Sequence, residues 1–428
     1  MTDIPLTQLK LYLKKITRIT CLELELLLCC ARTQVDQTTE EHIKELLQQG
    51  IDWTYLIQIS AHHGIIPLLY QNLSTTYPEL VPQPILSQMK DYCQSNIQHN
   101  LLLTQELFKL LTLFQKHKIP AIPFKGPVLA VSVYGNLALR PFCDLDILID
   151  EQNFLKAKTL VISHKYRLKY ELSWQTTFVD KNHQINLDLH CGLTPSYFPF
   201  PFNFEDLWQQ TKPILLLNKK IVNLSPEDLL IILCLQVAKD TWEKRGQLLK
   251  IYDIAQLLHT HQDFDWQKII EYASNRSIER LLFLGLFMAD DLFGIVLPIE
   301  IQQEVQERIQ KDLVIKLYID RVYKEIFSNM NNLYKQRNNY FSNFFEHLTL
   351  IFLARLLIEP SPKNGLYPGY FVWQFIHLLA TPIKEDKLFF MLPQYLDFLY
   401  YLIRPIRLMI KYSSRLFKIF RIGEYWTW

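Results

Sequence analysis

The stretch FKGPVLAVSVYGNLALRPFCDLDILID, residues 124–150, decides the fold because three local patterns follow one another in it. The short, proline-bounded apolar run IPAIPF, residues 119–124, leads into it and favours a strand. Residues 127–134 then favour a helix, since proline is tolerated in a first helical turn. Residues 144–149 read as a buried strand that carries two aspartates. The stretch therefore predicts a strand-helix-strand unit.

The two aspartates alternate with apolar residues, and a third acid further along the chain follows the same pattern. Side chains alternate between the faces of a strand, so Asp144 and Asp146 emerge together, about 7 Å apart. In QINLDLH, residues 184–190, Asp188 and His190 share one face in the same way. If the two strands are neighbours, three carboxylates converge at one place.

Three converging carboxylates repel one another unless divalent cations neutralise them. Mg²⁺ is characteristically bound by carboxylates together with substrate phosphates, and Mn²⁺ prefers the same oxygen ligands. The pattern thus predicts a Mg²⁺ or Mn²⁺ site at Asp144, Asp146 and Asp188 that binds an NTP. In a two-metal site the ions hold the attacking and leaving oxygens of an in-line displacement. Asp188 is also a candidate for orienting or deprotonating an acceptor hydroxyl.

Residues upstream of the acids fit a phosphate ligand. Gly126, at the strand-to-helix turn, lets backbone N–H groups approach phosphate oxygens. Lys125 and Arg140 add positive charge against a triphosphate, although Arg140 pairing with a nearby acid is an equal alternative. His190 has two interpretations as well, a hydrogen-bonded structural residue or a member of the site.

At these residues the chain resembles a known family. The Lys-Gly, Tyr-Gly, Arg and Asp-x-Asp elements of residues 125–146 look like the signature of the uncharacterised nucleotidyltransferase family, and residues 188–190 match its later acid-x-His element. Residues 222–259, which contain the Asp-Ile-Ala run Asp253–Ala255 near their end, resemble its helical segment. The resemblance implies a polymerase-beta-like nucleotidyltransferase fold, a divalent-metal site and transfer of a nucleotidyl group from an NTP to an acceptor that the sequence does not identify.

One departure from the broader superfamily concerns the phosphate loop. That superfamily usually has Gly-Gly or Gly-Ser where this chain has Lys125, Gly126 and Pro127, so a serine hydroxyl for phosphate is missing.

The predicted fold class is α+β, a small mixed sheet flanked by helical segments. Apolar residues recur every three or four positions before residue 118 and again after Ser225, which is a candidate N-cap. We therefore expect four parts, listed by residue: an N-terminal helical domain, 1–118; a nucleotidyltransferase catalytic core, 119–222; a helical domain packed on the core, 223–330; and a C-terminal helical region with a basic amphipathic end, 331–428.

Composition limits the other function classes. The 428 residues are 49% hydrophobic with a formal net charge of +2, so a long polyanionic nucleic-acid substrate is not favoured. Seven scattered cysteines without a CxxC pair indicate reduced thiols and a cytoplasmic location. The most apolar stretch, residues 388–409, contains Pro393, Asp397, Arg404 and Pro405, so no transmembrane segment is expected.

Two alternatives follow from these patterns. Basic residues at spacings of three and four within residues 404–421 predict one of three arrangements: peripheral contact with an anionic membrane, contact with a nucleic-acid backbone, or a helix docked on the body with its charges in water. The second alternative concerns activity: the same fold can serve as a catalytically silent nucleotide-binding or scaffold protein. Trp242, Lys244 and Arg245 are either part of an acceptor cleft or an exposed helix end.

Overall fold

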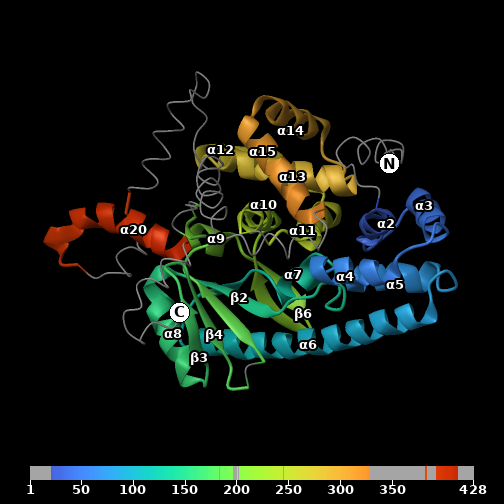
Figure 1. Ribbon diagram of the computed structural model, residues 1–428. Coiled ribbons are helices and arrows are strands. Elements are labelled where there is room, and N and C mark those ends of the chain that lie inside the picture. Colours follow the sequence, from blue (N-terminus) through green and yellow to red (C-terminus); the bar gives the residue numbers. More distant parts are fainter. Residues whose placement is uncertain are drawn as a thin grey trace.

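The computed structural model describes residues 21–327 except 183, 196–199, 201 and 244, together with 381–382 and 392–412. Helices form most of this part of the chain, and a small mixed sheet lies among them (Figure 1). This arrangement confirms the predicted α+β class. Most of the expected C-terminal helical region, 331–428, lies outside the described residues.

The chain begins with helices and enters the sheet at residue 121. The first helices are α2 (Leu22–Cys30), α3 (Gln37–Leu47), α4 (Trp53–His63), α5 (Ile66–Thr76) and the long α6 (Gln83–Lys116). The sheet region contains β1 (Ala121–Pro123), α7 (Pro127–Ser132), β2 (Asp144–Ile149), α8 (Glu151–Ser163), β3 (Arg167–Glu171), β4 (Gln175–Val179), β5 (Asn186–His190), α9 (Phe204–Gln210), β6 (Lys212–Leu216) and β7 (Lys219–Asn223).

Helices follow again after residue 225. They are α10 (Pro226–Trp242), α11 (Leu248–Thr260), α12 (Trp266–Asn275), α13 (Glu279–Phe293), α14 (Ile299–Lys311), α15 (Leu313–Phe327), the 3₁₀ helix η1 (Gln394–Leu399) and α20 (Tyr400–Tyr412). The predicted N-cap is confirmed, because the Ser225 hydroxyl accepts a hydrogen bond from the Asp228 backbone N–H at 3.1 Å. The Asp228 carboxylate accepts one from the Ser225 hydroxyl in return.

The main sheet has the strand order β1-β2-β5-β4-β3, and β6 pairs with β7 in a separate ribbon. Only the β2–β5 pair is parallel; the other three pairs of the main sheet are antiparallel. Because β2 and β5 are direct neighbours, Asp146 lies opposite Asp188 in the register. The predicted adjacency of the two acidic strands is therefore confirmed.

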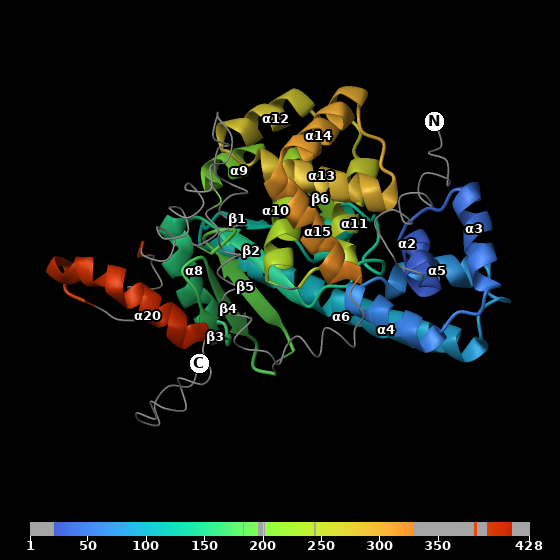
Figure 2. The ribbon, with the colours of Figure 1, turned by 45° about the horizontal axis from the view of Figure 1, so that its top comes forward.

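The two faces of this sheet have different surroundings. One face contributes Leu145, Ile147 and Leu187 to a core that also contains Leu107 and Phe114 of α6. Figures 1 and 2 show α6 running from the first helices to a position beneath the sheet, whereas α10 and α11 lie on the other side. Alternation along β2 and β5 thus buries the apolar side chains against α6 and turns the acids toward α10.

The first helices and the helices after residue 225 share one hydrophobic cluster. Leu26, Leu56 and Leu68 belong to the same group of buried side chains as Leu233 of α10 and Phe283 of α13. The helices expected in separate segments before 118 and after 223 therefore pack against each other. This packing holds α10 and α11 over the acidic face of the sheet.

The basic C-terminal pattern lies partly in α20. Arg404 and Arg407 are 1% and 8% exposed, so these two guanidinium side chains do not form an exposed basic stripe. The rest of the pattern lies outside the side chains that the structure describes. Among the described helices, none has the length and apolar character that a bilayer crossing requires.

Candidate active site

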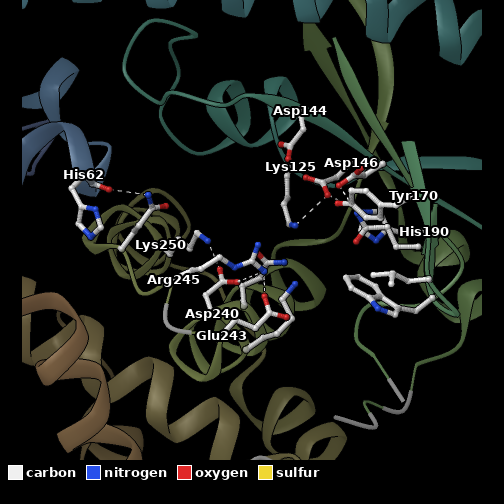
Figure 3. Close-up of a pocket in the computed structure, with 17 residues that line it drawn as sticks. His62, Lys125, Asp144, Asp146, Tyr170, His190, Asp240, Glu243, Arg245 and Lys250 are labelled. Atoms are coloured by element: carbon white, nitrogen blue, oxygen red, sulfur yellow. Dashed lines mark hydrogen bonds and ion pairs between the residues drawn. The ribbon is translucent and has the colours of Figure 1, made fainter. Parts of the chain in front are cut away.

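A cavity of about 480 Å³ lies between the acidic face of the sheet and the facing ends of α10 and α11. Its lining includes all three predicted acids, Asp144, Asp146 and Asp188, together with Lys125. Figure 3 shows Asp144 and Asp146 facing this space from the sheet. The strand alternation read from the sequence thus brings the three predicted acids into one cavity.

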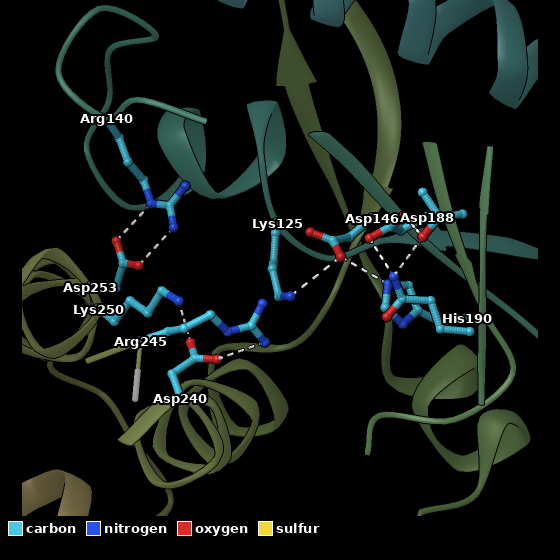
Figure 4. A network of polar contacts seen from close by, with 11 residues as sticks. Lys125, Arg140, Asp146, Asp188, His190, Asp240, Arg245, Lys250 and Asp253 are labelled. Atoms are coloured by element: carbon cyan, nitrogen blue, oxygen red, sulfur yellow. Dashed lines mark hydrogen bonds and ion pairs between the residues drawn. The ribbon is translucent and has the colours of Figure 1, made fainter. Parts of the chain in front are cut away.

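Asp146 is the most strongly held of the three carboxylates. Lys125 donates a hydrogen bond from Nζ to Oδ1 of Asp146 at 3.3 Å, and His190 contacts the same oxygen through Nε2 at 2.8 Å (Figure 4). Burial alone would raise the pKa of Asp146, but Lys125 and the hydrogen bond from His190 hold that pKa below its usual range. Asp146 is therefore ionised at neutral pH, and its Oδ2 accepts no hydrogen bond from a described residue.

Asp188 is oriented by two neutral donors from the adjacent strand. The hydroxyl of Thr177 donates to Oδ1 and the amide of Gln175 donates to Oδ2, both at 2.5 Å. Thr177 lies beside Asp188 in the β4–β5 register, which fixes this contact. Burial raises the pKa of Asp188, while the hydrogen bond from Thr177 opposes that rise.

Asp144 begins β2 and has no hydrogen-bond partner among the described residues. Burial raises the pKa of its carboxyl group to about 7, and the negative charge of Asp146 adds to the rise. The carboxylates therefore repel one another, and a bound cation would relieve this repulsion. The crowding of acids supplies the electrostatic reason for a metal ion.

The residues present fit a divalent cation. Ligand atoms of Asp146, Asp188 and His190 all lie within 4.8 Å of one another, and lone pairs remain on both carboxylates because an ionised carboxylate accepts about four hydrogen bonds. Sequence reasoning left His190 undecided between two roles, and its position beside Asp146 now includes it in the candidate site. Its Nδ1 is buried without a hydrogen-bond partner.

Gly126 shapes the turn between β1 and α7. Its φ of 56° lies in the region that favours glycine, and a Cβ atom there would approach the carbonyl oxygen of Asp144 to 3.3 Å. Gly126 thus lets the turn pass close to the first residue of β2. Its predicted contact with phosphate remains a prediction.

Arg140 has the acid partner that the sequence left as an alternative. Its Nε and Nη2 donate to the two carboxylate oxygens of Asp253 at 2.7 and 2.8 Å, and the hydroxyl of Tyr134 donates to the same carboxylate at 2.6 Å. Figure 4 shows this pair on the side of the network away from His190. Arg140 does not line the cavity, so its predicted role against a triphosphate has no contact in its support.

Several cavity residues come from α10, α11 and the turn between them. The sequence analysis did not identify Lys239, Asp240 and Lys250 as site residues. The residue pattern of a helix does not show which distant part of the fold each of its faces will contact. Arg245, which the sequence placed either in an acceptor cleft or at an exposed helix end, lines the cavity. Lys244 and the side chain of Trp242 lie outside the described residues.

Comparison with known proteins gives a family match and two similar solved structures. The model of a family described as uncharacterised nucleotidyltransferase matches residues 49–294. A crystal structure of the lincosamide antibiotic adenylyltransferase LnuA bound to lincomycin is 20% identical, with a TM-score of 0.29; the match covers 37% of this chain and 97% of that one.

The second structure is an antigenic nucleotidyltransferase-like protein from Paracoccidioides brasiliensis. It is 12% identical with a TM-score of 0.27, and the match covers 48% of this chain and 96% of that one. No curated protein sequence matches at a significant level. The family match spans more than half of the chain and includes every residue of the candidate site, so the chain belongs to the family of uncharacterised nucleotidyltransferases.

Proposed function

We propose that the protein transfers a nucleotidyl group from an NTP to an acceptor in a reaction that depends on Mg²⁺ or Mn²⁺. Asp144, Asp146 and Asp188 would hold the cations, and an NTP would bind with its phosphates in the cavity. The observation that carries this proposal is the direct opposition of Asp146 and Asp188 on neighbouring parallel strands, with Asp144 in the same cavity. The NTP preference and the acceptor are left to experiment.

The bonds change in one displacement. An acceptor oxygen or nitrogen forms a bond to the α-phosphorus, the bond from that phosphorus to the bridging oxygen of the β-phosphate breaks, and pyrophosphate leaves. When bound, the cations would stabilise the charge that develops on the attacking and leaving oxygens. The acceptor's proton would pass to a carboxylate, for which we propose Asp188.

The protein's own residues prepare this reaction by fixing the carboxylates. Thr177 and Gln175 hold both oxygens of Asp188 from β4, so its side chain does not rotate to pair elsewhere. Lys125 and His190 hold Oδ1 of Asp146 and leave Oδ2 available to a ligand. Such preorganisation lowers the cost of ordering the site when substrate binds.

Transfer is tested by incubating the purified protein with Mg²⁺, a cell extract and each α-labelled NTP in turn. We expect an adduct of nucleoside-monophosphate mass, detected by mass spectrometry, and a loss of more than about a hundredfold in Asp146→Asn, because metal ligands matter at least as much as their outer partners. Asp91→Asn, an exposed α6 residue outside the cavity, is the matched control.

The catalytically silent alternative predicts a different outcome. A silent protein would bind NTP without forming any adduct, and Asp146→Asn would change binding alone. An adduct that forms equally well in Asp146→Asn would also contradict the proposal, because the acids would then not be the reacting centre.

A further inference from the structure

The cavity has a second charged wall that the carboxylates do not explain. Four cationic side chains line it, and we call them the cationic wall: Lys125, Lys239, Arg245 and Lys250. Figure 3 shows Arg245 and Lys250 across the space from Asp146 and His190. The sheet side of the cavity therefore carries the three acids and Lys125, and the α10–α11 side carries the other three cations beside Asp240 and Glu243.

Three members of the cationic wall have carboxylate partners. Lys125 pairs with Asp146 at 3.3 Å, and Lys250 forms a short contact with Asp240. Arg245 pairs with Glu243 and lies 3.9 Å from Asp240. These three cations are at least partly neutralised within the protein.

Lys239 differs from the other three. Its side chain is 6% exposed, yet its ammonium group forms no hydrogen bond or ion pair with a residue in the described part of the chain. The group lies 5.0 Å from the ring centroid of Trp174, in a cation–π contact. The ammonium group has three donors, and an aromatic ring offers them no acceptor oxygen, so they are available to a ligand in the cavity that Lys239 lines.

The charges around Lys239 favour the binding of an anion. Burial lowers the pKa of Lys239 to about 8; Asp240 opposes this shift, whereas Lys125, Arg245 and Lys250 add to it. The neighbouring cations thus disfavour a fourth positive charge at this place. An anion bound in the cavity would reverse that penalty.

We infer that Lys239 anchors the polyphosphate of the donor nucleotide. This inference rests on the proposed function and adds the residue that would hold the β- and γ-phosphates, a role in which Arg140 has no supporting contact. The α-phosphate would lie beside the metal-binding acids, and the β- and γ-phosphates would extend from there toward α10 and α11. Lys239 keeps its charge toward the cavity because Trp174 packs against it from the sheet side.

Binding of inorganic tripolyphosphate in the presence of EDTA tests the inference without metal or turnover. Isothermal titration calorimetry of the full-length chain should show that Lys239→Met weakens binding by about tenfold or more, which is the loss expected for one charge-assisted contact. Lys239→Arg should recover most of the affinity. Lys109→Met, an exposed lysine on α6 that pairs with Glu106, should bind as the wild type does.

A measurement on the wild type covers the case in which Lys239→Met does not fold. The rate of Lys239 acetylation by acetic anhydride, followed by mass spectrometry, should fall severalfold when tripolyphosphate is added, while the rate at Lys109 should not change. Unchanged affinity in folded Lys239→Met, no binding by the wild type, or no protection of Lys239 would each overturn the inference.

The inference and the proposed function fail in different ways. Tripolyphosphate binding that depends on Lys239, with no adduct from any NTP, would refute nucleotidyl transfer but retain the anion site. A different outcome would refute the role of Lys239 alone. In that outcome Asp146→Asn loses transfer, but Lys239→Met keeps the wild-type KM for NTP.

Discussion

At the scale of single residues, the site depends on how a few side chains hold the carboxylates. His190 is 3% exposed, lies between Phe124 and Trp174, and contacts Asp146 through Nε2. A carboxylate only accepts hydrogen bonds, so Nε2 carries the proton in this contact. His190 therefore acts through Asp146 as a positioning residue.

Substitution of His190 tests this role. We expect His190→Ala to lower both Mn²⁺ affinity and transfer by about 10–100-fold, the usual cost of losing an outer partner of a metal ligand. His190→Gln, which can donate from a similar position, should recover part of both. If His190→Ala lost stability in urea but kept wild-type Mn²⁺ affinity, the residue would be purely structural.

Gly126 gives a second test at this scale. Gly126→Ala meets both an unfavourable φ of 56° and the carbonyl oxygen of Asp144, so we expect a loss of about 1–3 kcal/mol in unfolding free energy, together with reduced transfer. Gly50→Ala is the control, because its φ is also positive, 82°, but a Cβ there meets nothing within 4 Å. Equal losses in the two variants, measured by urea unfolding, would contradict a tight approach at Gly126.

At the scale of elements, a buried ion pair joins the segment before β2 to α11. Arg140, in the segment before β2, donates two hydrogen bonds to Asp253 of α11, and Tyr134 donates a third. This contact links Tyr134 and Arg140 to the run Asp253–Ala255. It holds α11, which carries Lys250, over the sheet.

Removing one partner of this ion pair should lower the unfolding free energy strongly, because the other partner is then left as an unpaired buried charge. We expect Arg140→Met and Asp253→Leu each to lower the unfolding free energy by about 3–5 kcal/mol, and the double variant to lose clearly less than the sum. The exposed pair Lys324 and Asp320 on α15 is the comparison, with a coupling below about 1 kcal/mol. Additive losses at Arg140 and Asp253 in urea unfolding would show that the pair does not couple the elements.

At the scale of the whole molecule, the first helices and the later helices form one packed body. His63 marks this junction, since its Nδ1 accepts a hydrogen bond from the backbone N–H of Leu248 in α11 at 3.3 Å. Burial lowers the pKa of His63 from 6.5 to about 3. The packed body therefore requires His63 to be neutral.

This requirement makes stability depend on pH. The folded pKa lies below the unfolded value, so the unfolded state binds more protons, and the stabilisation present above pH 6.5 is lost as the pH falls. Between pH 7 and pH 5 we expect His63 to remove about 2 kcal/mol of unfolding free energy. His63→Gln should abolish that part of the slope, whereas the exposed His164→Gln should keep it; an unchanged slope in His63→Gln would contradict a neutral buried imidazole.

The sequence predicted the acidic face because strand alternation is a local rule. Asp146 and Asp188 lie opposite each other because β2 and β5 are adjacent and each acid has a fixed place in the alternation of its own strand. The sequence analysis did not predict strand β3, although its residues Arg167–Glu171 alternate between charged and apolar, and all five of them are exposed. The partner of Arg140 lies 113 residues away, and Lys239 belongs to a helix whose facing surface is set by tertiary packing. Such contacts have no local signature.

Titration with Mn²⁺, followed by electron paramagnetic resonance, measures whether the acids on neighbouring strands bind a divalent cation together. We expect the wild type to remove the free Mn²⁺ signal and Asp146→Asn and Asp188→Asn each to weaken binding by more than about tenfold, while Asp91→Asn does not. Wild-type Mn²⁺ affinity in both cavity variants, with their folds intact, would contradict this expectation.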